Sequence, residues 1–390
     1  MRKSVFIGLA VIFLFMLAPM AAHAAEPAET LKVGVIGPLS GPAALWGTNM
    51  ETILEVIADE VNGKGGLKVG NKVYTIKIIP YDDKYQGEAA LTAANRLIYE
   101  DKVKYIFGPM GSASILSAQT ATEKEKVLLI MNGFTKKGIS PDKPFTFRCT
   151  TTPFEYAVPE AAWLASNRNV KSVVVVLPNS ETGREGAEGN RIGFQKAGIK
   201  ILSEEIYEPG APDMLPLVTR LMRYKPDLLD FDGGNPGDSV NIAKIARTQG
   251  YKGMMSKLGG GGETCVQAAP DVFDGFMFQE EADINAGGKL GELIKEVRRR
   301  KPQNPVDMLI CKYYVVFGML SKAMQIAGAV DDTNAVRLAL EKIEGFPGPD
   351  GGTYSWTGKE TYGINHQLRG PIVFAGASRG KIVLLDKLTY

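Results

Sequence analysis

The chain has 390 residues, of which 45% are hydrophobic and 23% are charged, and its formal net charge is +2. This length is sufficient for two domains with separate hydrophobic cores. Because the charge is nearly balanced, there is no large basic field, and nucleic acid is not expected as a partner. The three cysteines, Cys149, Cys265 and Cys311, fit no metal-ligand spacing, and nothing in the sequence selects a disulfide among them. We expect neither a metal nor a cofactor.

The N-terminus has the pattern of an export signal. Met1-Arg2-Lys3 is basic, residues 5–17 form an apolar run, and Ala22-His23-Ala24 supplies small residues around a cleavage point. The apolar run is too short to span a membrane comfortably, which disfavours a retained anchor helix. The sequence therefore predicts a signal peptide over residues 1–24, cleaved near Ala24, and an exported mature protein.

From residue 31 the chain alternates between strand-like and helix-like segments. Alternation of this kind predicts parallel strands joined by right-handed crossovers. In the first part, strands are expected at 31–36, 73–80, 103–107 and 127–131, and helices around 53–61, at 86–100 and from Ile115.

The alternation starts again after residue 150, which predicts a second lobe of the same α/β class. Strands are expected at 172–177, 199–207 and 228–231, helices at 155–167, 184–197, 212–224, 238–249, 290–300, 308–327 and 334–342, and a glycine-rich turn at 257–262. The tail, 354–385, is expected to contribute edge strands at most. The fold class is therefore α/β, with two doubly wound, Rossmann-like lobes.

Ligands of open α/β sheets bind outside the carboxyl ends of the strands. Two sets of loops occupy these positions, 37–46, 108–114 and 132–135 in the first lobe, and 179–183, 233–236 and 259–263 in the second. Facing loops form a cleft that can close on a small molecule. In the loop at 111–114, small side chains and a helix start favour a small carboxylate, although an ordinary capped turn explains the same residues.

Catalytic chemistry is poorly represented. Of two histidines, His23 leaves with the signal peptide and His366 lies in the tail, and no zinc, disulfide-exchange or nucleophile-elbow motif is present. Asp82-Asp83 follows a strand and is more simply a turn than an acid–base pair or a metal site. The sequence therefore does not predict an enzyme.

Several segments, in this order, resemble the periplasmic leucine/isoleucine/valine-binding proteins of ABC transporters, the type I periplasmic binding proteins. These segments are residues 33–42, Trp46-Gly47, 62–66, 81–83 and 108–114. The resemblance extends over essentially the whole mature chain. It implies a periplasmic monomer that delivers its ligand to an ABC permease in the inner membrane.

The resemblance also implies how the chain divides. Lobe one would contain 31–149 and 279–345, and lobe two 150–278 and 346–390. Three hinge crossings would then fall near 148–152, 276–279 and 345–352.

Ligand-binding residues are implied at matching positions. The ligand carboxylate would be held by two loops, and aromatic walls would come from Trp46 and Phe134, although Trp46 could instead be a buried core residue. The loop residues are Gly111, Ser112 and Ala113, and Gly133, Phe134 and Thr135.

The sequence departs from the amino-acid binders where they hold the ligand ammonium. Thr182 and Asn235 stand at tyrosine positions, and 258–262, where an acid is expected, contains glycines such as Gly259. The possible substitutes, Glu155, Asp232, Asp238 and Glu263, are each more simply explained as solvated loop or helix-start charges. Burying an ammonium without acceptors costs several kcal/mol.

The predicted ligand is thus a small carboxylate, either an amino acid or a related aromatic, branched or 2-oxo acid. A ligand sensor that acts on a signalling partner, and more remotely an amidase-like enzyme, are the alternative functions.

Overall fold

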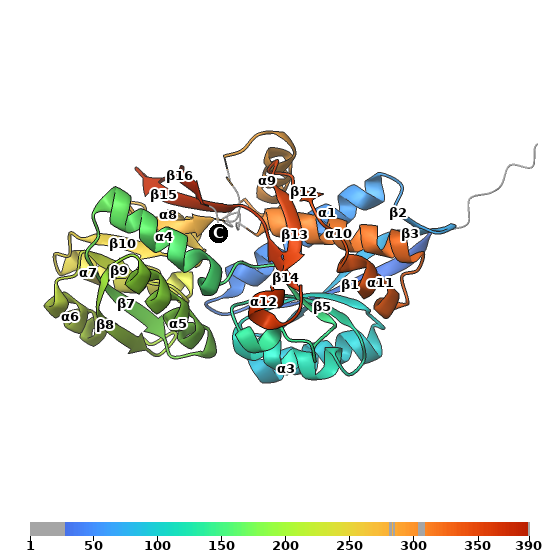
Figure 1. Cartoon of the computed structure of the whole chain (residues 1–390), viewed down its shortest axis with the longest axis horizontal. Helices are drawn as coiled ribbons and strands as arrows, with labels where there is room; N and C mark the ends of the chain where they lie inside the picture. Colours follow the sequence, from blue (N-terminus) through green and yellow to red (C-terminus); the bar gives the residue numbers. More distant parts are fainter. Residues whose placement is uncertain (1–27, 281–282, 284, 303–308, 389–390) are drawn as a thin grey trace, which may run out of the picture.

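The computed structural model describes residues 28–280, 283, 285–302 and 309–388, and within them the chain forms two lobes (Figure 1). Each lobe is built on one sheet with helices on both faces, which confirms the predicted two-lobed, doubly wound α/β class. The expected signal peptide, with His23, lies outside the described residues. Over these same ranges, no helix is both long and apolar enough to cross a membrane.

The sheet of lobe one has the order β12-β13-β14-β6-β5-β4-β1-β3-β2. The pairs among β3, β1, β4, β5 and β6 are parallel. The core strands are continuous apolar runs because helices cover both of their faces. The strands are β1 (Glu29–Gly37), β2 (Leu67–Val69), β3 (Lys72–Asp82), β4 (Tyr105–Met110), β5 (Leu128–Asn132), β6 (Thr146–Arg148), β12 (Phe346–Pro347), β13 (Thr353–Thr357) and β14 (Gln367–Arg369).

Two groups of helices cover the faces of this sheet. One face packs against α1 (Ala44–Gly63), α9 (Gly288–Arg300), α10 (Ile310–Ala327) and α11 (Thr333–Leu340). The other packs against α2 (Gly87–Asn95), the π-helical turn η1 (Arg96–Glu100) and α3 (Ser112–Thr122). Two short helices, η2 (Lys136–Gly138) and α12 (Lys359–Tyr362), lie in the connections. Because α9, α10 and α11 follow lobe two in the sequence, the chain returns to lobe one.

The sheet of lobe two has the order β16-β15-β11-β10-β9-β7-β8. Its strands are β7 (Ser172–Pro178), β8 (Lys200–Tyr207), β9 (Leu228–Asp230), β10 (Met254–Lys257), β11 (Met277–Glu280), β15 (Ile372–Ser378) and β16 (Lys381–Leu388). Helices α4 (Pro153–Arg168) and α5 (Glu181–Lys196) cover one face, and α6 (Leu215–Tyr224), α7 (Pro236–Thr248) and α8 (Gly262–Ala268) cover the other.

The tail differs from the prediction. Strands β12, β13 and β14 belong to the sheet of lobe one, so the assignment of residues 346–369 to lobe two is wrong. The chain crosses between β14 and β15, at Gly370-Pro371, and not near 345–352. Strand β15 lies between β11 and β16 and is not an edge strand; its first six residues are buried. Glycine and proline at the crossing break the apolar pattern, so the local sequence of the tail does not indicate interior strands.

The other two crossings lie close to their expected places. Strand β6 ends at Arg148 and α4 begins at Pro153, so the first crossing is between them. Strand β11 continues to Glu280 in the sheet of lobe two, so the second crossing follows that residue and not 276–279.

Three local differences concern the cleft. Helix α3 begins at Ser112 and not at Ile115, and Trp46 lies in the first turn of α1 and not in a loop. Strand β10 was not expected at all, because its four residues are too short to give a periodic pattern.

Candidate functional site

A cavity lies between the lobes, at the carboxyl ends of both sets of parallel strands. The centres of water-sized molecules can occupy about 90 Å³ of it. From lobe one it is lined by Trp46, Tyr85, Met110, Gly111, Gly133 and Phe134. From lobe two it is lined by Thr182, Gly233, Lys257 and Gly259, and Gln279 and Thr151 line it at the crossings.

The structure brings six of the ten predicted site residues to this cavity, namely Trp46, Gly111, Gly133, Phe134, Thr182 and Gly259. Three others, Ser112, Ala113 and Asn235, line an adjoining cavity of about 350 Å³. The two cavities share Gly111 and Thr182, so they are neighbouring parts of one cleft. Thr135 lines neither cavity.

Thr135 is held away from the cleft by Arg148, the last residue of β6. The guanidinium of this fully buried arginine donates to the Thr135 carbonyl, to the Tyr362 hydroxyl at 3.1 Å and to Gln367 Oε1 at 3.2 Å. These bonds connect the loop after β5 to the tail segment in lobe one. Thr135 therefore has a structural role at the hinge.

Asn235 caps α7. Its Oδ1 accepts from the backbone N–H of Asp238 at 2.9 Å, and its Nδ2 donates to the Asp238 carboxylate at 2.7 Å. This is the preferred arrangement at a helix start, where the first N–H groups lack partners in the helix. The capping role explains the asparagine without a ligand.

Trp46 and Tyr85 form the aromatic wall of lobe one, with ring centroids 6.0 Å apart. Gly47 allows α1 to approach the loop closely, since a Cβ there would lie 2.2 Å from the Pro38 carbonyl oxygen. The same loop is held by Asp82, which accepts from Leu39 N at 2.8 Å and Ser40 Oγ at 2.6 Å. Although burial raises the pKa of Asp82, these hydrogen bonds keep it below its usual value. Asp82 is thus an anchor for the loop.

Tyr85 was missed in the sequence, although an aromatic residue just after the carboxyl end of a strand was a usable signal. Burial raises the pKa of the Tyr85 hydroxyl. A hydrogen bond with Thr182 of lobe two lowers this pKa, but burial has the larger effect. Thr182 Oγ1 also lies 3.5 Å from both the backbone N and the Oγ of Ser112. A threonine at a tyrosine position thus contacts lobe one directly.

Gly259 separates the cavity from Asp232. A Cβ at this position would lie 2.2 Å from Asp232 Oδ1 and 2.9 Å from Phe134 Cζ. Asp232 is fully buried and accepts from the Tyr156 hydroxyl at 2.9 and 3.0 Å, from Asn190 Nδ2 at 2.9 Å and from Gly233 N at 2.8 Å. Its carboxylate is therefore already satisfied by protein donors.

The other acids that could replace the missing ammonium partner are also hydrogen-bonded to other groups of the protein. Glu263 accepts from Gln267 at 2.9 Å and from Arg298 at 3.3 Å, and Glu155 accepts from Thr152 N at 2.8 Å. Asp238 is bonded to Asn235 and to Gly210 N. Among the described residues that line the cavity, none is an aspartate or a glutamate.

Among the described residues of the lining, Lys257 is the cationic one. It ends β10, is fully buried, and donates to the carbonyl oxygens of Gly234 at 2.6 Å and Phe231 at 3.5 Å. Burial lowers the pKa of its ammonium, and the negative charge of Asp232 opposes this shift. Behind it, burial and the Asp232 charge raise the pKa of Asp230 to about 7. Lys257 was not predicted as a site residue because the strand that it ends, β10, was not predicted either.

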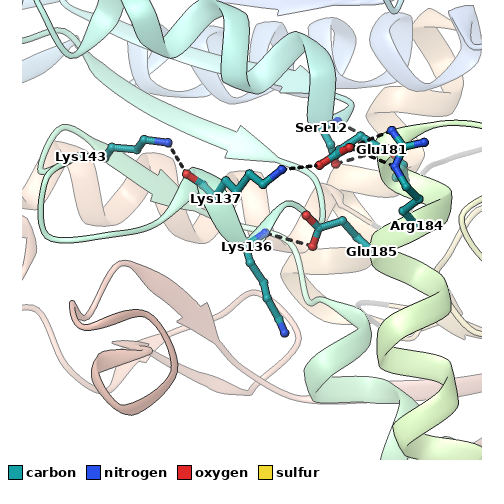
Figure 2. Close-up of polar contacts among 8 residues, drawn as sticks. Ser112, Lys136, Lys137, Lys143, Glu181, Arg184 and Glu185 are labelled. Atoms are coloured by element: carbon teal, nitrogen blue, oxygen red, sulfur yellow. Dashed lines mark hydrogen bonds and ion pairs between the residues drawn. The ribbon is translucent and has the colours of Figure 1, made fainter.

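The lobes also contact each other beside the cleft (Figure 2). Lys136 Nζ lies 2.6 Å from Glu188. The Lys136 backbone N donates to Glu185 at 3.1 Å and the Lys137 ammonium lies 3.1 Å from Glu181, and Figure 2 draws both of these contacts. The lysines are the first two residues of η2 in lobe one, and the glutamates lie on α5 in lobe two. We call Lys136, Lys137, Glu181, Glu185 and Glu188 the cross-lobe cluster. It holds the lobes in a closed arrangement around the cavity.

His366 does not reach the cleft. Its ring is fully buried in lobe one, stacked on Phe147 with centroids 3.8 Å apart, and bonded to the Thr146 carbonyl and to Glu341. It has a complete structural explanation there.

Comparison with known proteins agrees with this geometry. A family model described as periplasmic binding protein matches residues 30–381. The chain is 22% identical to the Leu/Ile/Val/Thr-binding protein of Salmonella typhimurium, over 84% of this chain and 92% of that protein. It is 27% identical to the Leu/Ile/Val-binding protein of Citrobacter freundii, over 85% of this chain and 88% of that protein.

Solved structures share the fold. LivJ of Streptococcus pneumoniae, in complex with isoleucine, has a TM-score of 0.79 and 20% identity, and covers 92% of this chain and 99% of its own. A solute-binding protein of an ABC transporter from R. palustris, in complex with benzoate, has a TM-score of 0.77 and 18% identity, with coverage of 92% and 96%.

Proposed function

Because the chain belongs to the periplasmic binding protein family, we propose that it is the solute-binding component of an ABC importer for a small carboxylate without an α-ammonium group. The proposal includes export by the signal peptide at residues 1–24 and delivery of the ligand, by a monomer, to a permease in the inner membrane. It also includes binding without catalysis.

One observation carries the choice of ligand class, namely that the described residues lining the cavity include a lysine and no carboxylate. A buried α-ammonium needs an anion or several neutral acceptors, and lacking them costs several kcal/mol. Asp232, which lies behind Gly259, is bonded to Tyr156 and Asn190. An acid without an amino group avoids that cost. The benzoate bound by a structural neighbour is an acid of this kind.

The proposed orientation places the ligand carboxylate against lobe one, at the backbone of Gly111 and Gly133. Gly111 directly precedes α3, where unpaired N–H groups and the helix dipole favour negative charge. The apolar part of the ligand then lies between Trp46, Phe134 and Met110. A ligand that touches both lobes stabilises the closed form, which is the form a permease would receive.

Isothermal titration calorimetry on refolded, ligand-stripped mature protein tests the proposal with matched pairs. The pairs are L-phenylalanine with 3-phenylpropanoate, and L-leucine with 4-methylpentanoate and 4-methyl-2-oxopentanoate, with benzoate added. We expect at least one deaminated acid to bind about tenfold or more tighter than its amino acid, which corresponds to about 1.4 kcal/mol. Tighter binding of the amino acids, or no binding of any acid, would overturn the proposal.

A further inference from the structure

Gln279 presents an unused hydrogen-bond donor to the cavity. It lies on β11, is 2% exposed, and lines the cavity. Within the described chain its Nε2 has no hydrogen-bond partner. Leaving a buried donor unpaired costs about 1–3 kcal/mol, so such groups call for an explanation. A ligand acceptor in the cavity supplies one.

Lys257 is a second donor that lines the same cavity. Strands β10 and β11 are parallel neighbours, and Lys257 pairs with Phe278, one residue before Gln279. An ammonium has three N–H donors. The Lys257 ammonium makes one short hydrogen bond, to the Gly234 carbonyl at 2.6 Å, and one long hydrogen bond, to the Phe231 carbonyl at 3.5 Å. Lys257 ends β10, Gln279 lies one residue before the end of β11, and both bring donors to the cavity.

These donors lie across the cavity from the loops of Gly111 and Gly133 in lobe one. The proposed function places the ligand carboxylate at those loops, so the donors of lobe two face the other end of the ligand. An ammonium and an amide N–H₂ both require an acceptor, and neither bonds favourably with a methyl group or another donor.

We infer that the ligand carries a second oxygen acceptor at the end remote from its carboxylate, and that Lys257 and Gln279 bind that oxygen. This inference rests on the proposed function. The matching chemical class is an acid with a distal hydroxyl, oxo or second carboxylate group. Recognition at both ends also explains closure, because the ligand then bonds to groups on both lobes.

The test compares benzoates that differ in the group opposite the carboxylate. Full-length mature protein is titrated calorimetrically with 4-hydroxybenzoate, terephthalate, benzoate and 4-methylbenzoate, the last of which matches 4-hydroxybenzoate in size but lacks the acceptor. We expect the wild type to bind 4-hydroxybenzoate or terephthalate about tenfold tighter than 4-methylbenzoate.

Two variants test the assignment of the donors. Lys257→Met and Gln279→Leu remove the polar groups at similar side-chain volume, and each should reduce the preference for the distal acceptor at least threefold, while benzoate affinity changes less. Lys200→Met, at an exposed lysine that begins β8, is the matched control and should leave every affinity unchanged. Circular dichroism and thermal melting establish that each variant is folded. If Lys257→Met does not fold, the ligand series on the wild type and Gln279→Leu still decide the question.

The outcomes separate the two proposals. Binding of no acid overturns the proposed function. Equal binding of 4-hydroxybenzoate, terephthalate and 4-methylbenzoate overturns this inference and leaves the proposed function standing. An unchanged preference in both folded variants overturns the roles of Lys257 and Gln279.

Discussion

Replacing Gly259 with alanine should weaken ligand binding by acting on the closed arrangement of the lobes. The added Cβ would lie 2.2 Å from Asp232 Oδ1, 2.5 Å from the Tyr156 hydroxyl and 2.9 Å from Phe134 Cζ. Asp232 and Tyr156 belong to lobe two, so their part of the clash is present whether the cleft is open or closed. Phe134 belongs to lobe one, and its clash exists only when the lobes meet.

The magnitude follows from the cost of overpacking. An extra methyl group in a well-packed site costs about 1–3 kcal/mol. If the contact with Phe134 accounts for about 1–2 kcal/mol of this, the dissociation constant rises about 5- to 30-fold. The clash within lobe two should also lower the melting temperature of the ligand-free protein.

The assay is calorimetric titration of the wild type and Gly259→Ala with the acid that the wild type binds most tightly, combined with thermal melting without ligand. Gly63→Ala is the matched control, because a Cβ at that helical position meets no atom within 4 Å. Wild-type affinity in Gly259→Ala would refute the reasoning, since it would mean that the glycine does not limit the approach of Phe134.

Two further predictions concern charge. Replacing both Lys136 and Lys137 with methionine should weaken ligand binding about two- to thirtyfold at low salt, because two partly exposed ion pairs are worth about 0.2–1 kcal/mol each. The effect should fade in 1 M NaCl; titration at both salt concentrations checks this, and an equal loss at both would contradict it. Asp230 has a folded-state pKa of about 7 against an ordinary value of 3.8, so the folded protein binds more protons than the unfolded chain and stability falls as pH rises between these values. Urea denaturation between pH 5 and 7.5 measures how the free energy of unfolding falls with pH, and Asp230→Asn should remove most of that fall. A smaller fall should remain from Asp83, because burial raises its pKa to about 6. An unchanged dependence of the unfolding free energy on pH would count against this prediction.

The fold was largely predictable because its signals are local. Runs such as 173–177 are continuous Val and Leu, which suits strands covered on both faces, and the helices between them have apolar residues at helical spacing. The tail was predicted less well. Pairing of β14 with β6 and of β15 with β11 joins residues more than 90 positions apart, and no local pattern encodes such a partner.

The candidate site was predictable where glycines and small residues mark the ends of strands. Gly111, Gly133 and Gly259 follow this rule and line the cavity. Thr135 and Asn235 stand in loops of the same kind, yet a buried arginine and a helix cap account for them. A loop position alone does not say whether a side chain faces ligand or protein.

Local sequence patterns are enough to predict the class of fold, the two lobes and the loops that meet between them, because hydrophobic periodicity and strand ends are properties of neighbouring residues. Which charges reach the cavity depends on tertiary contacts. Asp232 follows β9 and Lys257 ends β10, both buried strands of lobe two, but Asp232 is enclosed behind Gly259 whereas Lys257 lines the cavity. Burial and hydrogen-bond partners come from segments far apart in the chain, and these contacts determine whether a charge is available to a ligand.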